Sequence, residues 1–84
     1  MSYQLLILRR AQRELASLPA PEYERVKEAV RKLAGEPRPP GCRKLAGREG
    51  WRIRVGDYRV IYEVNDQERT MVVLHVGHRR DVYR

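Results

Sequence analysis

Apolar and polar residues follow two different periods along the chain, and the change of period predicts the order of its elements. The short apolar run over residues 3–8 predicts a buried strand, although the start of a helix would also fit it. Residues 9–18 space their apolar side chains by four and three positions, which predicts a short amphipathic helix that Pro19 ends. A second helix is expected to begin at Pro21 and end at Gly35, because proline fits a first helical turn and glycine a C-terminal cap. Since the link between them is so short, the two helices should form an antiparallel hairpin.

The second half of the chain changes to the two-residue period of β-strands. Strands are predicted over residues 51–55, 58–64 and 70–76. Gly56-Asp57 has the residues of a two-residue hairpin turn, so the first two of these strands should lie antiparallel. Residues 35–50 hold four glycines and three prolines, which predicts an irregular loop between the helices and this hairpin.

The resulting order, β-α-α-β-β-β, predicts an α+β fold. We expect the N-terminal helical hairpin to pack on one face of a mainly antiparallel four-stranded sheet, within a single domain over residues 1–84. One face of the sheet should then stay uncovered. No apolar run reaches the length of a membrane span, and the N-terminus lacks the layout of a secretory signal. The lone cysteine, Cys42, favours a reducing, cytoplasmic environment and has no histidine nearby in sequence that would make it a nucleophile.

The charge of the chain narrows the class of partner. The net charge is +7, and arginine accounts for 15 of the 18 basic residues. A guanidinium group is planar, forked and permanently charged, so it suits phosphate recognition better than solubility requires. The composition therefore favours a polyanion such as nucleic acid, although charge that only keeps the protein soluble would look similar. No spacing of histidine, cysteine and carboxylate residues suggests a metal site, and no glycine-rich loop suggests a nucleotide cofactor.

The predicted hairpin gathers arginines on one side of the sheet. Because side chains alternate along a strand, Arg52 and Arg54 point away from the face that carries the apolar residues of the same strand. Closing the hairpin at Gly56-Asp57 places Arg54 directly opposite Arg59. Like charges opposed across strands destabilise a sheet, so this arrangement predicts a polyanion-binding face. The alternative is a solvated face on which carboxylates such as Glu63 offset the repulsion.

Several segments together resemble the RelE/ParE toxin superfamily of bacterial and archaeal toxin–antitoxin systems. They are Leu18-Pro19 after the first helix, Lys44-Leu45-x-Gly47, residues 51–54 (WRIR), residues 56–62 (GDYRVIY) and residues 76–83 (VGHRRDVY). The resemblance covers nearly the whole chain. The pattern Gly-His-Arg-Arg-x-x-Tyr at its end is similar to the RelE branch rather than to the gyrase-poisoning ParE branch.

The resemblance implies a function. RelE-type toxins enter the ribosomal A site and cleave the mRNA there, so a metal-independent endoribonuclease that inhibits translation is expected. Attack by the RNA 2′-hydroxyl would yield a 2′,3′-cyclic phosphate and a 5′-hydroxyl. The family also implies an acidic cognate antitoxin that restrains the toxin in a heteromeric complex, together with the ribosome and mRNA as partners, and no cofactor.

The resemblance further assigns site residues. Arg59 and Arg79 would grip the scissile phosphate, while Arg52 and Arg54 would position the RNA and neutralise charge. Some relatives carry lysines at these last two positions, and lysine can exchange a proton whereas arginine effectively cannot. The predicted catalytic residues are Arg59, His78, Arg79 and Tyr83, and the predicted RNA-binding residues are Lys44, Arg48, Arg52, Arg54 and Arg80.

The sequence leaves open which residues transfer protons in the reaction. His78 has a side chain that titrates near neutrality and adjoins Arg79, so it is either a proton carrier or a solvated histidine. Tyr83 could donate a proton, stack on an RNA base, or only pack the tail onto the sheet. His75, with apolar neighbours in the last strand, is expected to be a packed or edge histidine.

Two other functions fit the same features. A ParE-like poison of DNA gyrase would share the fold without nuclease chemistry. A non-enzymatic RNA-binding module would use the arginine face for affinity alone and would bind RNA in a salt-dependent way. The clustered arginines together with Arg79 and Tyr83 favour the nuclease.

Overall fold

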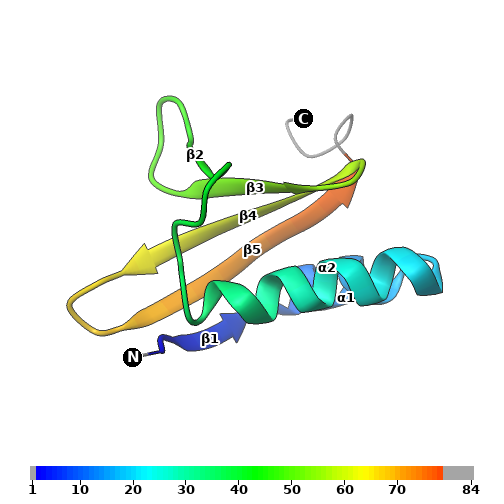
Figure 1. Cartoon of the computed structure of the whole chain (residues 1–84), viewed down its shortest axis with the longest axis horizontal. Helices are drawn as coiled ribbons and strands as arrows, with labels where there is room; N and C mark the ends of the chain where they lie inside the picture. Colours follow the sequence, from blue (N-terminus) through cyan, green and yellow to red (C-terminus); the bar gives the residue numbers. More distant parts are fainter. Residues whose placement is uncertain (1, 79–84) are drawn as a thin grey trace.

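The computed structural model describes residues 2–78, which form a mixed sheet with two helices on one face (Figure 1). The elements are β1 (Gln4–Ile7), α1 (Arg9–Ala16), α2 (Ala20–Leu33), β2 (Arg43–Lys44), β3 (Trp51–Val55), β4 (Tyr58–Asn65) and β5 (Thr70–His78). The sheet order is β1-β5-β4-β3-β2, in which β1 lies parallel to β5 and all other neighbours are antiparallel. The two helices run antiparallel to each other along the same side of the sheet. The predicted α+β class and helical hairpin are therefore confirmed.

The predicted number of strands was wrong. The sheet has five strands within residues 2–78, because Arg43 and Lys44 pair with β3 inside the segment expected to be an irregular loop. A strand of two residues is too short to show an alternating pattern. The backbone reverses at Gly50, whose φ of 121° lies in the region that glycine favours. A side chain there would also come within 3.0 Å of Leu45 Cδ1.

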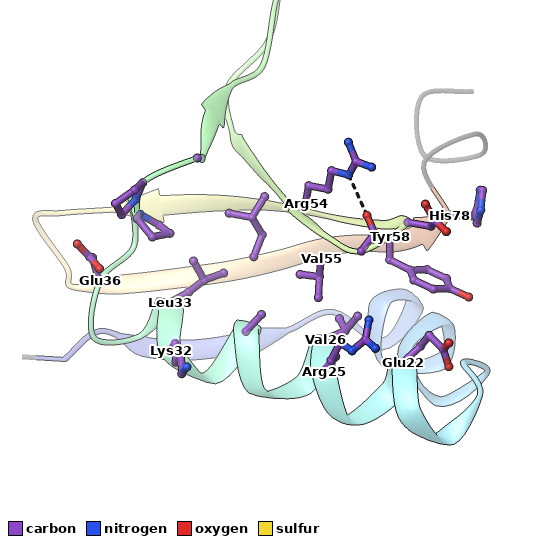
Figure 2. Close-up of a pocket in the computed structure, with 17 residues that line it drawn as sticks. Glu22, Arg25, Val26, Lys32, Leu33, Glu36, Arg54, Val55, Tyr58 and His78 are labelled. Atoms are coloured by element: carbon purple, nitrogen blue, oxygen red, sulfur yellow. Dashed lines mark hydrogen bonds between the residues drawn. The ribbon is translucent and has the colours of Figure 1, made fainter.

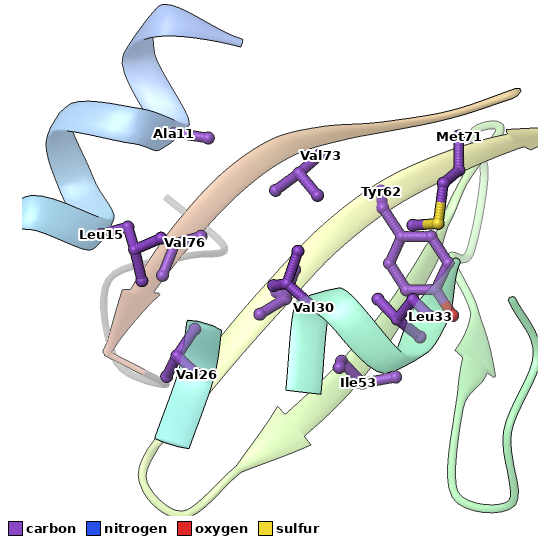
Figure 3. Close-up of a cluster of buried hydrophobic side chains, with 11 residues drawn as sticks. Ala11, Leu15, Val26, Val30, Leu33, Ile53, Tyr62, Met71, Val73 and Val76 are labelled. Atoms are coloured by element: carbon purple, nitrogen blue, oxygen red, sulfur yellow. The ribbon is translucent and has the colours of Figure 1, made fainter. Parts of the chain in front are cut away.

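The hydrophobic core lies between the helices and the face of the sheet that they cover (Figure 3). Three of its largest buried side chains are Leu33 on α2, Tyr62 on β4 and Met71 on β5. The Tyr62 hydroxyl donates a hydrogen bond to the Pro37 carbonyl, which satisfies the polar end of the buried ring and ties the loop after α2 to the sheet. Burial raises the pKa of Tyr62 above its ordinary value. No helix within residues 2–78 is long and apolar enough to cross a membrane.

A β-bulge changes the phase of β5 halfway along the strand. Tyr62 pairs with Val73 and Ile61 with His75, so β5 contains one extra residue between these pairs. Beyond Ile7 β1 has ended, and Glu14 of α1 takes its place at this edge of β5. Glu14 Oε1 accepts hydrogen bonds from the backbone N–H of Val76 at 2.9 Å and from Nδ1 of His75 at 2.7 Å. The prediction of a packed or edge histidine at His75 is confirmed.

The carboxyl group of Glu14 is held in its charged form. Partial burial opposes ionisation, but the hydrogen bonds from Val76, His75 and Arg10 outweigh it and set the pKa of Glu14 below its ordinary value. Because the ionised carboxylate of Glu14 can only accept, His75 must donate the hydrogen bond through Nδ1. The other ring nitrogen, Nε2, lies 3.3 Å from Nη2 of Arg10. This cluster fastens α1 to the sheet by polar contacts where the apolar core ends.

Candidate nucleic-acid interface

The β3–β4 hairpin has the predicted register, and this register creates an open face that carries arginines. Arg54 pairs with Arg59 and Ile53 with Val60, as expected from a turn at Gly56-Asp57. Ile53 and Val60 are buried in the core, so the neighbouring arginines project from the face that the helices leave uncovered. Arg54 is exposed, and its Nε donates to the Gly56 carbonyl at 2.8 Å (Figure 2). The predicted grouping of Arg52, Arg54 and Arg59 on one face follows from this pairing.

The short strand β2 adds an arginine that was not among the predicted site residues. Arg43 pairs with Arg52, so it lies on the open face beside the three predicted arginines. Its side chain is exposed. In the sequence, Arg43 is marked only by its position next to Lys44. A strand of two residues has no alternating pattern that would show whether Arg43 or Lys44 lies on the face of the arginines.

The register places Lys44 on the side of the sheet opposite the strand arginines, and its RNA-binding role stays a prediction. Lys44 pairs with Trp51, and its Nζ lies 5.6 Å from the centroid of the Trp51 ring. Arg38 Cζ lies 5.1 Å from the same centroid. Two cations thus pack on one indole on the helix-covered side. Arg48 is exposed in the loop between β2 and β3, which projects from the body of the protein, and its RNA-binding role stays a prediction (Figure 1).

His78 is not brought together with the arginines on the strands. It ends β5 opposite Tyr58, and the two rings meet edge to face with centroids 5.8 Å apart. Arg59 pairs with Gly77, so the side chains of His78 and Arg59 leave the sheet on opposite sides. Adjacent positions in a regular stretch of strand face opposite ways, and the predicted strand ended at residue 76, two residues before His78. Its role as a proton carrier stays a prediction, as do the roles of the remaining site residues, which lie outside the described part of the chain: Arg79, Arg80 and Tyr83.

A groove of about 860 Å³ lies on the helix-covered side, between α2 and the β3–β4 hairpin (Figure 2). Its floor is apolar, with Val26, Leu33 and Val55 among the residues that line it, and Tyr58 and His78 lie at one end. Of the three predicted arginines on the strands, Arg54 lines the groove and the other two do not. In the described residues no three His, Cys, Asp or Glu side chains are grouped so that they could hold a metal ion.

Some arginines of the described chain are paired with carboxylates, whereas Arg43 and Arg54 on the open face are not. Arg38 Nη2 lies 2.8 Å from Asp66 Oδ2, and this contact holds the pKa of Asp66 below its usual range. Arg31 binds Glu28 at 2.8 Å in the same way. Within residues 2–78, neither Arg43 nor Arg54 forms an ion pair with a carboxylate. Charge at these two positions is therefore available to an external anion.

Known proteins match this fold and this hairpin. The family model described as ParE toxin of type II toxin-antitoxin system, parDE, matches residues 5–83. Toxin RelG of Mycobacterium tuberculosis is 38% identical over 88 residues, covering 100% of this chain and 99% of the relative. The toxin in the archaeal RelE–RelB complex from Pyrococcus horikoshii OT3 superposes with a TM-score of 0.84 at 34% identity, covering 98% of this chain and 100% of that one. The chain of the intact E. coli RelBE toxin–antitoxin complex gives a TM-score of 0.80 at 28% identity, over 92% of this chain and 96% of that one.

A small basic α+β protein with this sheet order and an arginine-bearing open face belongs to the class of type II toxins. The chain is a RelE-type member of the RelE/ParE superfamily of toxin–antitoxin toxins.

Proposed function

We propose that this toxin is a ribosome-dependent endoribonuclease that cleaves mRNA in the A site without a metal ion and thereby inhibits translation. The observation that carries the proposal is the opposition of Arg54 and Arg59 on the open face, with Arg52 on the same side of β3. Two guanidinium groups on neighbouring strands can reach one phosphate, whose negative charge would remove their mutual repulsion.

The chemistry needs little beyond charge and alignment. The 2′-oxygen of the RNA attacks the adjacent phosphorus, the bond from phosphorus to the 5′-oxygen breaks, and a 2′,3′-cyclic phosphate is left. Arginines stabilise the extra negative charge of the transition state. Such electrostatic stabilisation is usually the largest single contribution to catalysis. Because arginine does not release its proton, another group must take the proton from the 2′-oxygen and supply one to the 5′-oxygen. Arg79 and Tyr83 are our candidates for completing the site, whereas the side chain of His78 leaves the sheet on the side opposite Arg59.

The relatives support the proposed antitoxin partner. The solved relatives include an archaeal RelE–RelB complex and the intact E. coli RelBE complex. We infer that this toxin likewise binds a cognate antitoxin of acidic character, which would neutralise its net charge of +7. Its targets would be the ribosome and mRNA in the cytoplasm.

The test is to add the purified chain to a translating extract and map new 5′ ends on a reporter mRNA. Wild-type protein should produce cuts at ribosome-occupied codons, and Arg59→Ala should reduce the rate by about 100-fold or more, as for the loss of one group that stabilises transition-state charge. Arg13→Ala is the matched control, because it removes an exposed arginine from α1 on the other side of the sheet. Thermal unfolding checks that each variant is folded. Intact message with the wild-type protein would overturn the proposal.

The match to the ParE family model favours one alternative, a poison of DNA gyrase. Such a protein would leave mRNA intact, induce the DNA-damage response, and stabilise cleaved DNA in a purified gyrase assay. The same preparations used for the mRNA assay separate the two functions.

A further inference from the structure

The open face carries two pairs of opposed arginines. Arg54 pairs with Arg59 across β3 and β4, and Arg43 pairs with Arg52 across β2 and β3. All four lie on the side of the sheet that the helices leave uncovered, and the second pair stands two residues along β3 from the first. Arg43 has no part in the proposed site of cleavage.

The second pair is as unfavourable for the sheet as the first, because like charges directly opposite each other repel. On the other face of β2, the neighbouring cation is paired with a carboxylate, as charged side chains in proteins commonly are. There Lys44 Nζ lies 3.6 Å from Glu49 Oε2 and packs on the Trp51 ring. Arg43 is exposed and forms no ion pair within residues 2–78. One cation of β2 is therefore neutralised within the protein, and the other is presented to solvent beside Arg52.

The spacing of the two pairs suits consecutive phosphates. Residues directly opposite each other lie about 5 Å apart across strands, so both arginines of a pair can reach one anion. The two pairs stand two residues apart along β3, about 6.6 Å, and flank its opposite sides, about 4.8 Å apart, so their midpoints lie about 8 Å from each other. The long side chains of the arginines can close the remaining difference from one nucleotide step in single-stranded RNA. Carboxylates two residues apart on an extended strand of a protein partner would have a similar spacing, so the experiment has to separate RNA binding from antitoxin binding.

We propose that Arg43 and Arg52 form a second phosphate subsite, which binds the phosphate next to the one held at Arg54 and Arg59. Single-stranded RNA would then lie along β3, running from the Gly56-Asp57 turn toward β2. The identity of the first phosphate as the scissile one rests on the proposed function, whereas the existence of two adjacent phosphate subsites does not.

The experiment measures binding of the full chain to a short single-stranded RNA as a function of salt. Every sugar of this RNA carries a 2′-O-methyl group, so the RNA lacks the attacking hydroxyl and stays intact whether or not the protein is a nuclease. Arg43→Gln should weaken binding by about tenfold, the loss expected for one charge-assisted contact. It should also reduce the slope of log K against log salt by about 0.7, the value for one phosphate contact on a single strand. Arg13→Gln, which removes the same charge from α1, should leave both quantities unchanged.

A neutral linkage locates the contact. The RNA is a trinucleotide with two phosphates, and two further versions carry one methylphosphonate each, at the first or at the second linkage. On one of them, Arg43→Gln should bind as well as wild type, because the partner of Arg43 has already lost its charge. Thermal unfolding of Arg43→Gln should show equal or higher stability, which excludes misfolding as the cause of weaker binding.

The outcomes separate this inference from the proposed function. A normal salt slope for Arg43→Gln, a loss that persists with both neutral linkages, or failure of the wild-type chain to bind the all-phosphate RNA at low salt would overturn the subsite. The subsite would also be overturned if Arg43→Gln lost affinity for the antitoxin but not for RNA. If the wild-type chain bound RNA through both subsites but never cut mRNA, the subsite would stand and the nuclease would fall.

Discussion

The two faces of the β3–β4 hairpin contribute to the stability of the sheet in opposite ways. On the helix-covered face, Ile53 and Val60 are buried and packed against the helices. On the open face, Arg54 and Arg59 stand at the neighbouring paired positions, where they repel each other. Burial explains the first face completely. The second face places like charges opposite each other, and the phosphate that we propose to bind there would compensate them.

The largest effect on stability should come from the covered face. Leu33 is 1% exposed and packs among the core side chains, so Leu33→Ala should lower the free energy of unfolding by about 2–5 kcal/mol. Leu8, at 47% exposure, is the control, and Leu8→Ala should change it by no more than about 0.5 kcal/mol. Urea denaturation of both variants checks this. Equal losses at the two positions would show that the core has been placed wrongly.

A smaller effect is expected at the edge where Glu14 joins α1 to β5. The pKa of Glu14 is lowered in the folded protein, so the unfolded chain holds the proton more tightly. Its stabilisation should therefore be complete above the ordinary glutamate pKa of about 4.3 and be lost as the pH falls through the lower folded value. Glu14→Gln should cost about 1–2 kcal/mol at pH 7, since it weakens charge-assisted bonds to Val76, His75 and Arg10.

Urea unfolding of wild type and Glu14→Gln between about pH 3 and 7 measures this cost, and the two curves should converge at the acidic end. Glu28→Gln removes the carboxylate of an exposed ion pair within α2 and should have a much smaller effect. A difference between wild type and Glu14→Gln that stayed constant with pH would mean that the charge of Glu14 contributes nothing.

The smallest effect should have the opposite sign. Arg54→Thr relieves the repulsion with Arg59 and introduces a residue that favours strands, so it should raise the free energy of unfolding by about 0.2–1 kcal/mol. Arg54→Lys keeps the charge and should bring no such gain. Thermal unfolding resolves the difference, because 1 kcal/mol shifts the melting temperature of a domain of this size by about 4–8 °C. A clear loss of stability in Arg54→Thr would contradict the idea that the opposed arginines burden the sheet.

Local patterns predicted most of the fold. The alternation in residues 51–55 and the Gly56-Asp57 turn together determine the register of the hairpin, and with it the faces of Arg52, Arg54 and Arg59. The helical hairpin followed from apolar spacing and from the prolines that limit it. These features are set by neighbours in sequence, which is why the sequence sufficed.

The errors arose where pairing partners are distant or the element is short. Strand β2 depends on glycine turns that return two residues to β3, and its register decides that Arg43 rather than Lys44 joins the arginines. The continuation of β5 to His78 depends on pairing with Tyr58, which turns the histidine to the far side of the sheet. Neither pairing leaves a periodic signal in the sequence.

The rate at which Arg54→Thr cuts a reporter mRNA in a translating extract, measured beside its free energy of unfolding, tests the central claim most directly. We expect a protein that is at least as stable as wild type and cuts at least about tenfold more slowly. The guanidinium group of Arg54 repels Arg59 in the free protein, and in the proposed site it binds the phosphate. A variant that cuts at the wild-type rate, or that loses activity only in proportion to lost stability, would show that the open face does not hold the scissile phosphate.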